Sequence, residues 1–268
     1  MFRLSISNIG WKQENDEAVY SLMQKIGFSG LEIAPTRIFP TNPYEQNIQA
    51  VQAWVRDLWD MYKLTISSMQ SIWYGKSEKI FGSELERQEL IFYTKKAIDF
   101  AEAIGCKNIV FGCPKNRAIP EQLSGKDSNN IAVNFFHDIG EYAREHSTII
   151  GMEANPVIYG TNYINTTEEA IDLIKRVNSE GFKLNLDIGT MIYNNEDLSV
   201  LDDNVSLINH VHISEPNLAS VERHSLHSEL SKLLSRNGYE KYISIEAKST
   251  EDLGVLENEM LYVKEIFS

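Results

Sequence analysis

The stretch NHVHISEP, residues 209–216, alternates polar and β-branched residues as a buried β-strand does. On such a strand His210 and His212 point to the same face, about 6.6 Å apart at roughly 3.3 Å per residue. The Ser-Glu-Pro that follows is typical of the loop after a strand. The two histidines are therefore two ligands of one site, one ligand with a supporting neighbour, or two buried core residues.

Working outward, similar short apolar runs recur along the chain, and amphipathic helical patterns separate them. The predicted strands are 3–8, 30–34, 64–69, 107–112, 148–153, 183–187, 210–214 and 242–246. The predicted helices are 16–27, 47–63, 83–105, 128–147, 166–178, 226–238 and 250–267, with only a short one near 195–204. This α/β alternation predicts a single (β/α)8 TIM barrel domain over residues 1–268. An open doubly wound sheet is disfavoured, because no GxGxxG follows the first strand.

The amino-acid composition argues against some classes of binding partner. The 268 residues carry a formal net charge of −13, which repels nucleic acids and anionic membranes. No apolar run approaches the roughly 20 residues that span a bilayer, and the start of the chain does not resemble a secretory signal. The two cysteines form no ligand-spaced pair. We expect a soluble cytoplasmic protein that acts on a small molecule.

Ionisable side chains gather where the last four predicted strands end. Glu153, Asp187 and Glu246 end strands five, six and eight, and His212 lies near the end of strand seven. In a TIM barrel these ends surround the active site. If the carboxylates converge there, their repulsion raises their pKa values until a divalent cation neutralises them. Oxygen-rich ligands with one nitrogen suit Mn²⁺ best, then Mg²⁺ or Co²⁺, and Zn²⁺ less well. Alternatively, each is an ordinary acidic strand end facing solvent.

Four motifs carry a family resemblance. GMEANP (151–156), LNLDIGT (184–190), HVHISEP (210–216) and YISIEAK (242–248) resemble, in this order, the xylose isomerase-like TIM barrel superfamily. They are most similar to its sugar phosphate isomerase/epimerase branch, which includes ketose 3-epimerases and inosose dehydratase.

The resemblance implies a function and its residues. Glu153, Asp187, His212 and Glu246 would bind the metal, and the two glutamates would also serve as acid and base. The metal would hold a sugar carbonyl and its neighbouring hydroxyl, so that a proton moves through a cis-enediolate. The branch also implies a homo-oligomer, because such relatives are often dimers or tetramers.

The sequence also departs from the epimerases. Many of them carry a histidine at the position of Thr190 and often an acidic residue at that of Tyr159, and they often have an arginine soon after HxHxSE, where this chain has none before Arg223. These departures argue against a free hexulose as substrate. A dehydratase or lyase acting on an inosose-like or keto-sugar substrate is the main alternative. A sugar-binding barrel without catalysis stays open, whereas an endonuclease-type phosphodiesterase is disfavoured by the charge and by Thr190.

A second layer is expected beneath the metal. Two residues before each ligand stand Gly151, Asn185, His210 and Ser244, which are small or polar where barrel interiors usually hold Val, Ile or Leu. We therefore predict that His212, nearer the active face, is the ligand. His210, Asn185 and Ser244 should lie buried below it and support the ligands by hydrogen bonds.

Substrate contacts are predicted from position after the strands. The candidates are Lys115, Arg117, Glu215, Arg223, Tyr159, Trp11 and Glu32. Lys115 and Arg117 either bind a phosphate or carboxylate or form a solvated basic loop. Glu32 either faces the barrel mouth or is a buried, paired charge. The roles of His224 and His227 are left open.

Overall fold

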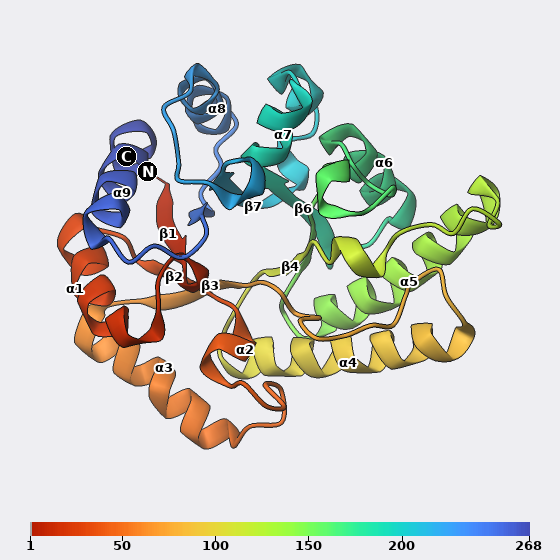
Figure 1. Ribbon diagram of the computed structural model, residues 1–268, viewed down its shortest axis with the longest axis horizontal. Coiled ribbons are helices and arrows are strands. Elements are labelled where there is room, and N and C mark those ends of the chain that lie inside the picture. The colour runs from red at the N-terminus through yellow and green to blue at the C-terminus, as the bar shows by residue number, and fades with distance from the viewer. Residues whose placement is uncertain (1) are drawn as a thin grey trace.

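The protein is described over residues 2–268 in a computed structural model, which shows a closed barrel of parallel strands. Figure 1 looks onto this barrel, with the strands at the centre and the helices around them. Neighbouring strands pair in chain order, and β1 also pairs with β8, which closes the sheet. The strands are β1 Arg3–Ser7, β2 Gly30–Ile33, β3 Thr65–Met69, β4 Ile109–Phe111, β5 Ile150–Met152, β6 Phe182–Asp187, β7 Ile208–Ser214 and β8 Tyr242–Glu246. The predicted TIM barrel is confirmed.

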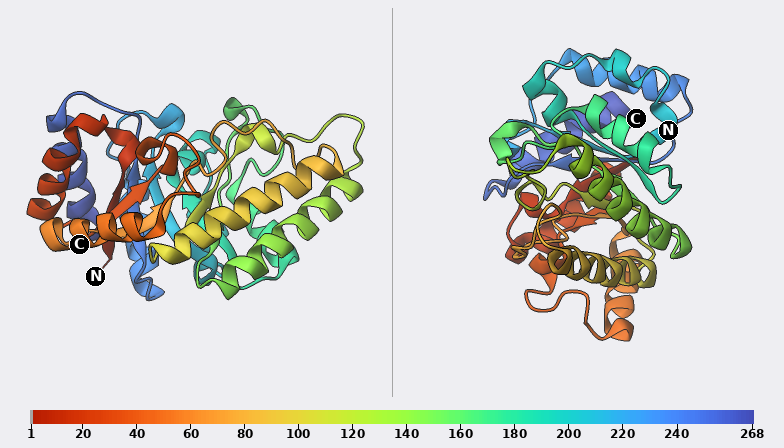
Figure 2. Two further views of the ribbon diagram at one scale, coloured as in Figure 1. Left: turned by 90° about the horizontal axis from the view of Figure 1, so that it is seen from below. Right: turned by 90° about the vertical axis from the view of Figure 1, so that its right-hand side faces the viewer.

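The helices cover the outside of the sheet, as both views in Figure 2 show. They are α1 Asp16–Ile26, α2 Pro35–Ile38, α3 Ile48–Tyr62, α4 Glu84–Ala103, α5 Gly125–Glu145, α6 Thr167–Val177, α7 Ile188–Asn194, α8 Ser225–Arg236 and α9 Leu253–Phe267. The ends of the chain lie side by side, with the rings of Phe2 and Phe267 5.9 Å apart. No helix in residues 2–268 is long and apolar enough to cross a membrane.

Local sequence signals explain most helix ends. Ser83 and Glu86 form a capping box that begins α4, with the serine side chain accepting from the Glu86 amide. Gly27, the predicted stop of the first helix, adopts φ +101° and donates its amide to the Met23 carbonyl. Both helix ends lie within one residue of the positions predicted from the sequence.

The region after β6 differs from the prediction. The short helix expected near 195–204 is a 3₁₀ helix at Leu198–Leu201. The helix α7, which begins directly after Asp187, was not predicted. Asp187 is itself the N-cap, because its carboxylate accepts from the Thr190 amide. A helix-capping aspartate is thus held at the mouth of the barrel.

The barrel interior is polar, in contrast to the apolar contact between sheet and helices. Asn185, His210 and Ser244 are at most 1% exposed, as predicted. Gly151 completes this layer because a Cβ there would lie 2.9 Å from Asn108 Oδ1 and 3.1 Å from Asn185 Cβ. Buried polar groups require partners. Asn185 Nδ2 donates to Glu153 Oε1 at 2.8 Å, and Ser244 Oγ lies 3.4 Å from Glu32 Oε1.

Candidate metal and active site

Four strand ends bring their ionisable side chains together at the carboxyl end of the barrel. Glu153 follows β5, Asp187 ends β6, His212 lies in β7 and Glu246 ends β8. Each offers one ligand atom, and these atoms all lie within 4.8 Å of one another. The convergence predicted from the sequence is therefore present.

His212 lies at the centre of the cluster. Its Nδ1 lies 2.9 Å from Glu153 Oε1 and 3.2 Å from Glu246 Oε2, whereas its Nε2 lies 3.0 Å from Glu32 Oε2. A proton on Nε2 would be donated to the Glu32 carboxylate, leaving the Nδ1 lone pair unprotonated, with Asn185 Nδ2 3.3 Å away. The ring is thus oriented to offer Nδ1 to a cation.

The electrostatics of the cluster reflect an excess of negative charge. Burial raises the pKa of Asp187 to about 7, and the charges of Glu153 and Glu246 add to this effect. Burial also raises the pKa of Glu246. For His212, burial opposes protonation, but Glu32 and Glu246 outweigh it and raise the pKa well above the ordinary value. Three carboxylates around one imidazole fit a divalent cation, whose charge would remove this repulsion.

Neutral donors fix the two glutamates. Gln70 Nε2 donates to Glu246 Oε1 at 2.7 Å. Asn155 Nδ2 donates to Glu153 Oε2 at 3.0 Å, and Asn185 Nδ2 donates to Glu153 Oε1 at 2.8 Å. Each glutamate therefore keeps one oxygen beside His212 while an amide donates to the other. At Glu153, Asn185 also donates to the oxygen beside His212.

Asp187 is held by hydroxyl and amide donors. The Thr190 amide and Oγ1 lie 2.8 and 2.6 Å from Asp187 Oδ2, and Ser214 Oγ donates to Oδ1. Thr190 stands where many epimerases carry a histidine, and here it is buried with only 1% exposure. The threonine thus orients Asp187 and is not among the described residues that line the cavity.

A cavity of about 160 Å³ opens above the cluster, bordered by the predicted ligands Glu153, Asp187 and Glu246. Two predicted substrate residues, Tyr159 and Glu215, also line it. The Tyr159 hydroxyl accepts from the Asn217 amide at 2.8 Å, which links the loops after β5 and β7.

The two histidines after β7 have different surroundings. His224 Nε2 lies 2.9 Å from Glu215 Oε1, so it contacts a cavity residue from behind. His227 is fully buried, and its Nδ1 lies 2.8 Å from the Tyr262 hydroxyl. Only His224 is therefore connected with the site.

The basic pair after β4 does not face the cavity, contrary to the prediction. The 3₁₀ turn Pro114–Asn116 leaves Lys115 exposed and directs Arg117 inward. Arg117 is 0% exposed and donates to the Glu153 carbonyl at 2.9 Å and to Asn155 Oδ1 at 2.8 Å. It supports the loop that carries Glu153, and burial lowers its pKa to about 10.

The predictions of Trp11, Arg223 and Glu32 as substrate contacts are also corrected. Trp11 is buried and donates to Asp16 at 2.8 Å, so it packs beneath the loop after β1. The Arg223 side chain is 66% exposed and pairs with Glu265 at 2.8 Å. Of the two alternatives predicted for Glu32, the structure shows the buried and paired charge. It is 0% exposed, and its Oε2 lies 3.2 Å from His210 Nε2 as well as beside His212.

The layer beneath the ligands is present, but its contacts are partly different from those predicted. Asn185 donates to Glu153, one of the predicted ligands, as expected. His210 and Ser244 instead face Glu32, with Ser244 Oγ 3.4 Å from Oε1. Burial opposes the charged form of Glu32, but the interactions with His212 and His210 outweigh this effect and lower the Glu32 pKa. Glu32 thus connects both histidines.

Gln70, Asn155 and Ser214 are site residues that the sequence reasoning missed. Gln70 directly follows β3, and Ser214 ends β7, so position at a strand end was the available signal. Asn155 lies two residues after Glu153, in a loop whose path the sequence does not reveal.

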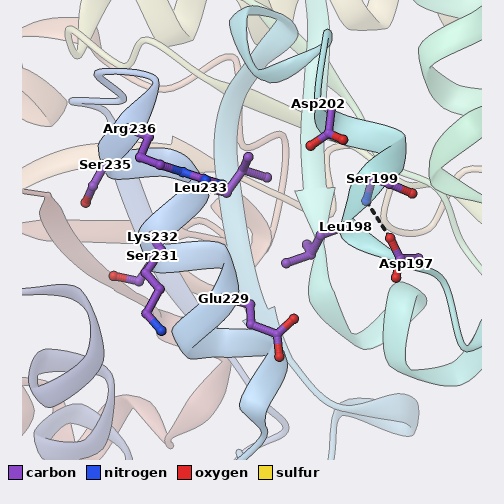
Figure 3. A pocket seen from close by; sticks show the side chains of 10 residues that line it. All are labelled: Asp197, Leu198, Ser199, Asp202, Glu229, Ser231, Lys232, Leu233, Ser235 and Arg236. Atoms are coloured by element: carbon purple, nitrogen blue, oxygen red, sulfur yellow. Dashed lines mark hydrogen bonds between the residues drawn. The ribbon is translucent and has the colours of Figure 1, made fainter.

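A larger groove lies elsewhere on the molecule. Figure 3 shows this groove of about 690 Å³, between α8 and the 3₁₀ turn Leu198–Leu201. Its charges are mixed: Glu229, Lys232 and Arg236 lie on α8, and Asp197 and Asp202 lie on the other side. Neither group of clustered ligand side chains found in residues 2–268 lies there. The smaller cavity at the barrel mouth is therefore the candidate site.

Comparison with known proteins agrees with this geometry. A family model described as xylose isomerase-like TIM barrel matches residues 20–266. No curated protein matches the chain. Among solved structures, 3-keto-D-glucoside 4-epimerase from E. coli has a TM-score of 0.78 at 18% identity, covering 99% of this chain and 100% of that one. D-Psicose 3-epimerase from Clostridium cellulolyticum H10, solved with D-tagatose, has a TM-score of 0.80 at 16% identity, with 100% of both chains covered.

A third similar structure is that of the IolI protein with a bound zinc atom. Its TM-score is 0.72 at 14% identity, and the match covers 99% of this chain and 96% of that one. At these identities the likeness shows the shared fold.

Proposed function

Because the chain belongs to the xylose isomerase-like TIM barrel family, we propose that it is a divalent-metal-dependent isomerase or epimerase of a sugar or sugar derivative. The observation that carries the proposal is the position of His212 Nδ1 between Glu153 at 2.9 Å and Glu246 at 3.2 Å. Two carboxylates on different strands thus meet at one point beside a cavity, as proton transfer to and from one substrate carbon requires.

The metal would be held by Glu153, Asp187, His212 and Glu246. A divalent cation bound there would polarise the substrate carbonyl and its neighbouring hydroxyl and so acidify the C–H bond between them. We favour Mn²⁺, because three carboxylates and one imidazole form an oxygen-rich set without thiolates.

The proton transfers are assigned to Glu153 and Glu246. One carboxylate would remove the proton, and the other would return one to the same carbon or to its neighbour. Asn155, Asn185 and Gln70 support this role, since their amides fix both carboxylates without adding charge. Tyr159 would close the cavity above the substrate.

The lining of the cavity favours an uncharged substrate. No lysine, arginine or histidine is among the described residues that line it, since Arg117 is turned away and Lys115 faces solvent. A phosphate or carboxylate placed there would meet Glu215 and the three acidic ligands without a protein cation to pair with. We therefore propose a neutral keto-sugar, glycoside or cyclitol ketone.

Deuterium exchange tests the proposal. The Mn²⁺-loaded protein is incubated in D₂O with neutral ketoses, keto-glycosides and inososes, and the products are analysed by NMR and mass spectrometry. Deuterium at the carbon beside the carbonyl supports an isomerase or epimerase. Loss of water would assign the lyase chemistry instead. Binding without exchange or water loss would contradict the proposed catalysis.

Two further properties belong to this proposal. We place the protein in the cytoplasm, because Cys106 and Cys113 are both free thiols, as is usual under reducing conditions. We also propose a homo-oligomer from the family resemblance. Cell fractionation and light scattering of the purified protein test these two points.

A further inference from the structure

A second cavity, of about 560 Å³, lies at the opposite end of the barrel, among the residues that begin the strands. Arg3 begins β1, Lys107 precedes β4 and Lys241 precedes β8, and all three line it. We propose that this cavity binds a small oxyanion, that is, a molecule with a phosphate or carboxylate group. Its volume is within the range of small-molecule sites, roughly 300–1,000 Å³.

Three cations that line this cavity, Arg3, Lys107 and Lys241, lack anionic partners among the described residues. Lys241 Nζ donates to the Ile208 carbonyl at 3.2 Å and to Asn209 Oδ1 at 2.9 Å. Lys107 Nζ donates to the Ser147 carbonyl at 3.0 Å. None of the ion pairs found in residues 2–268 involves these two lysines or Arg3. In a chain of net charge −13, such cations around one cavity form a local positive field.

The other charged residues that line this cavity, Arg144 and Glu180, are both paired with opposite charges and change its net positive charge little. Arg144 also lines it and is 3.1 Å from Glu141. Glu180, the one carboxylate among the lining residues described, is 83% exposed and pairs with Lys183 at 2.7 Å. Three cations without an acidic partner, Arg3, Lys107 and Lys241, thus line the cavity together with one carboxylate that is already paired.

Thr148 supplies an independent indication of a ligand. It lines the cavity and is only 2% exposed, and its buried Oγ1 has no hydrogen-bond partner among the described residues. Leaving a buried hydroxyl unpaired costs about 1–3 kcal/mol, so native proteins usually provide it with a partner. An oxyanion held by Lys107 and Lys241 could accept this hydrogen bond.

The cations are also arranged for recognition. The Arg3 guanidinium lies over the Tyr242 ring, 4.8 Å from its centroid, and only its Nε is engaged, by the Glu240 carbonyl. Its terminal nitrogens therefore remain available for two parallel hydrogen bonds to an oxyanion.

Titration calorimetry tests this inference. The metal-free full-length protein is titrated with inorganic phosphate and, separately, with succinate. We expect saturable one-site binding in the millimolar range. Tighter binding of phosphate would indicate a phosphorylated ligand, and tighter binding of succinate a carboxylate. Saturable binding of neither would overturn the inference.

Variants locate the binding. Lys107→Gln and Lys241→Gln should each weaken it by roughly tenfold. Thr148→Val, which is isosteric and removes no existing hydrogen bond, should fold normally and weaken it a few-fold. The control Lys232→Gln, in the outer groove, and Glu246→Gln, at the barrel mouth, should bind as the wild type does. Unchanged affinity in Lys107→Gln, Lys241→Gln and Thr148→Val, or lost affinity in Glu246→Gln, would contradict the assignment.

Discussion

The two ends of the barrel carry opposite charge. At the carboxyl end, Glu153, Asp187 and Glu246 surround one imidazole, and burial raises the pKa values of Asp187 and Glu246. At the amino end, Lys107 and Lys241 contact only neutral acceptors. The same closed sheet therefore presents an acidic centre at one end and a basic one at the other.

Neutral amides connect these ends through the barrel. Lys241 donates to Asn209 at 2.9 Å, and Asn209 donates to Asn108 at 2.8 Å. Asn108 Nδ2 lies 3.5 Å from Asn185 Oδ1, and Asn185 donates to Glu153 at 2.8 Å. The polar interior therefore separates two oppositely charged regions. Glu32, the buried carboxylate between them, contacts both His210 and His212, so its charge is paired.

The largest expected effect is on catalysis at the carboxyl end. Glu153→Gln and Glu246→Gln should each lower kcat by about 10²–10⁴-fold, because each removes a proton-transfer group. Once a substrate is identified, steady-state kinetics measure this loss. The matched control is Glu259→Gln, since Glu259 is also buried but lies in α9. Equal losses in the control and either site variant would contradict the assigned roles.

Replacing His212 and replacing His210 should have different effects on metal affinity. His212→Ala should lose the cation, because it removes Nδ1 from the ligand cluster. His210→Ala should retain it with roughly 10–100-fold lower affinity, because His210 acts through Glu32. Calorimetry with Mn²⁺ measures both. If the two variants lose the metal equally, His210 is a ligand and the layering is wrong.

Metal affinity should depend on pH with a defined sign. Asp187, with a pKa raised to about 7, must lose its proton before it binds a cation, so protons compete with the metal below that pH. His212, whose pKa is also raised, acts in the same direction. Affinity should fall by at least about tenfold per pH unit below pH 7. An affinity for Mn²⁺ that is constant between about pH 5.5 and pH 8 would refute this coupling.

A smaller effect is expected at Thr190. Thr190→Val removes the hydroxyl 2.6 Å from Asp187 and leaves the Ala154 carbonyl without that donor, so stability should fall by about 1 kcal/mol. Urea unfolding measures this change, and Mn²⁺ affinity should fall only a few-fold. Thr190→Ser keeps the hydroxyl and should retain both properties. Wild-type behaviour of Thr190→Val would show that the hydroxyl does not orient Asp187.

The sequence could predict what strand alternation determines. Residues at strand ends point to the barrel axis with a period of two, so Glu153, Asp187, His212 and Glu246 were placed together correctly, as was the buried layer around His210. Loops have no such periodicity. Lys115 and Arg117 share a loop, but a 3₁₀ turn exposes one and buries the other. Glu32 lies in β2, and its carboxylate is buried beside His210 and His212 instead of facing the cavity, a pairing that the sequence does not reveal.

One measurement tests the central claim directly, namely that the barrel mouth is a metal-dependent catalytic centre. Crystals soaked in Mn²⁺ are examined by anomalous diffraction above the manganese edge. The account predicts one strong peak bound by Glu153, Asp187, His212 Nδ1 and Glu246, and no peak among Arg3, Lys107 and Lys241. The absence of a peak at the four ligands, or a stronger peak elsewhere, would contradict it.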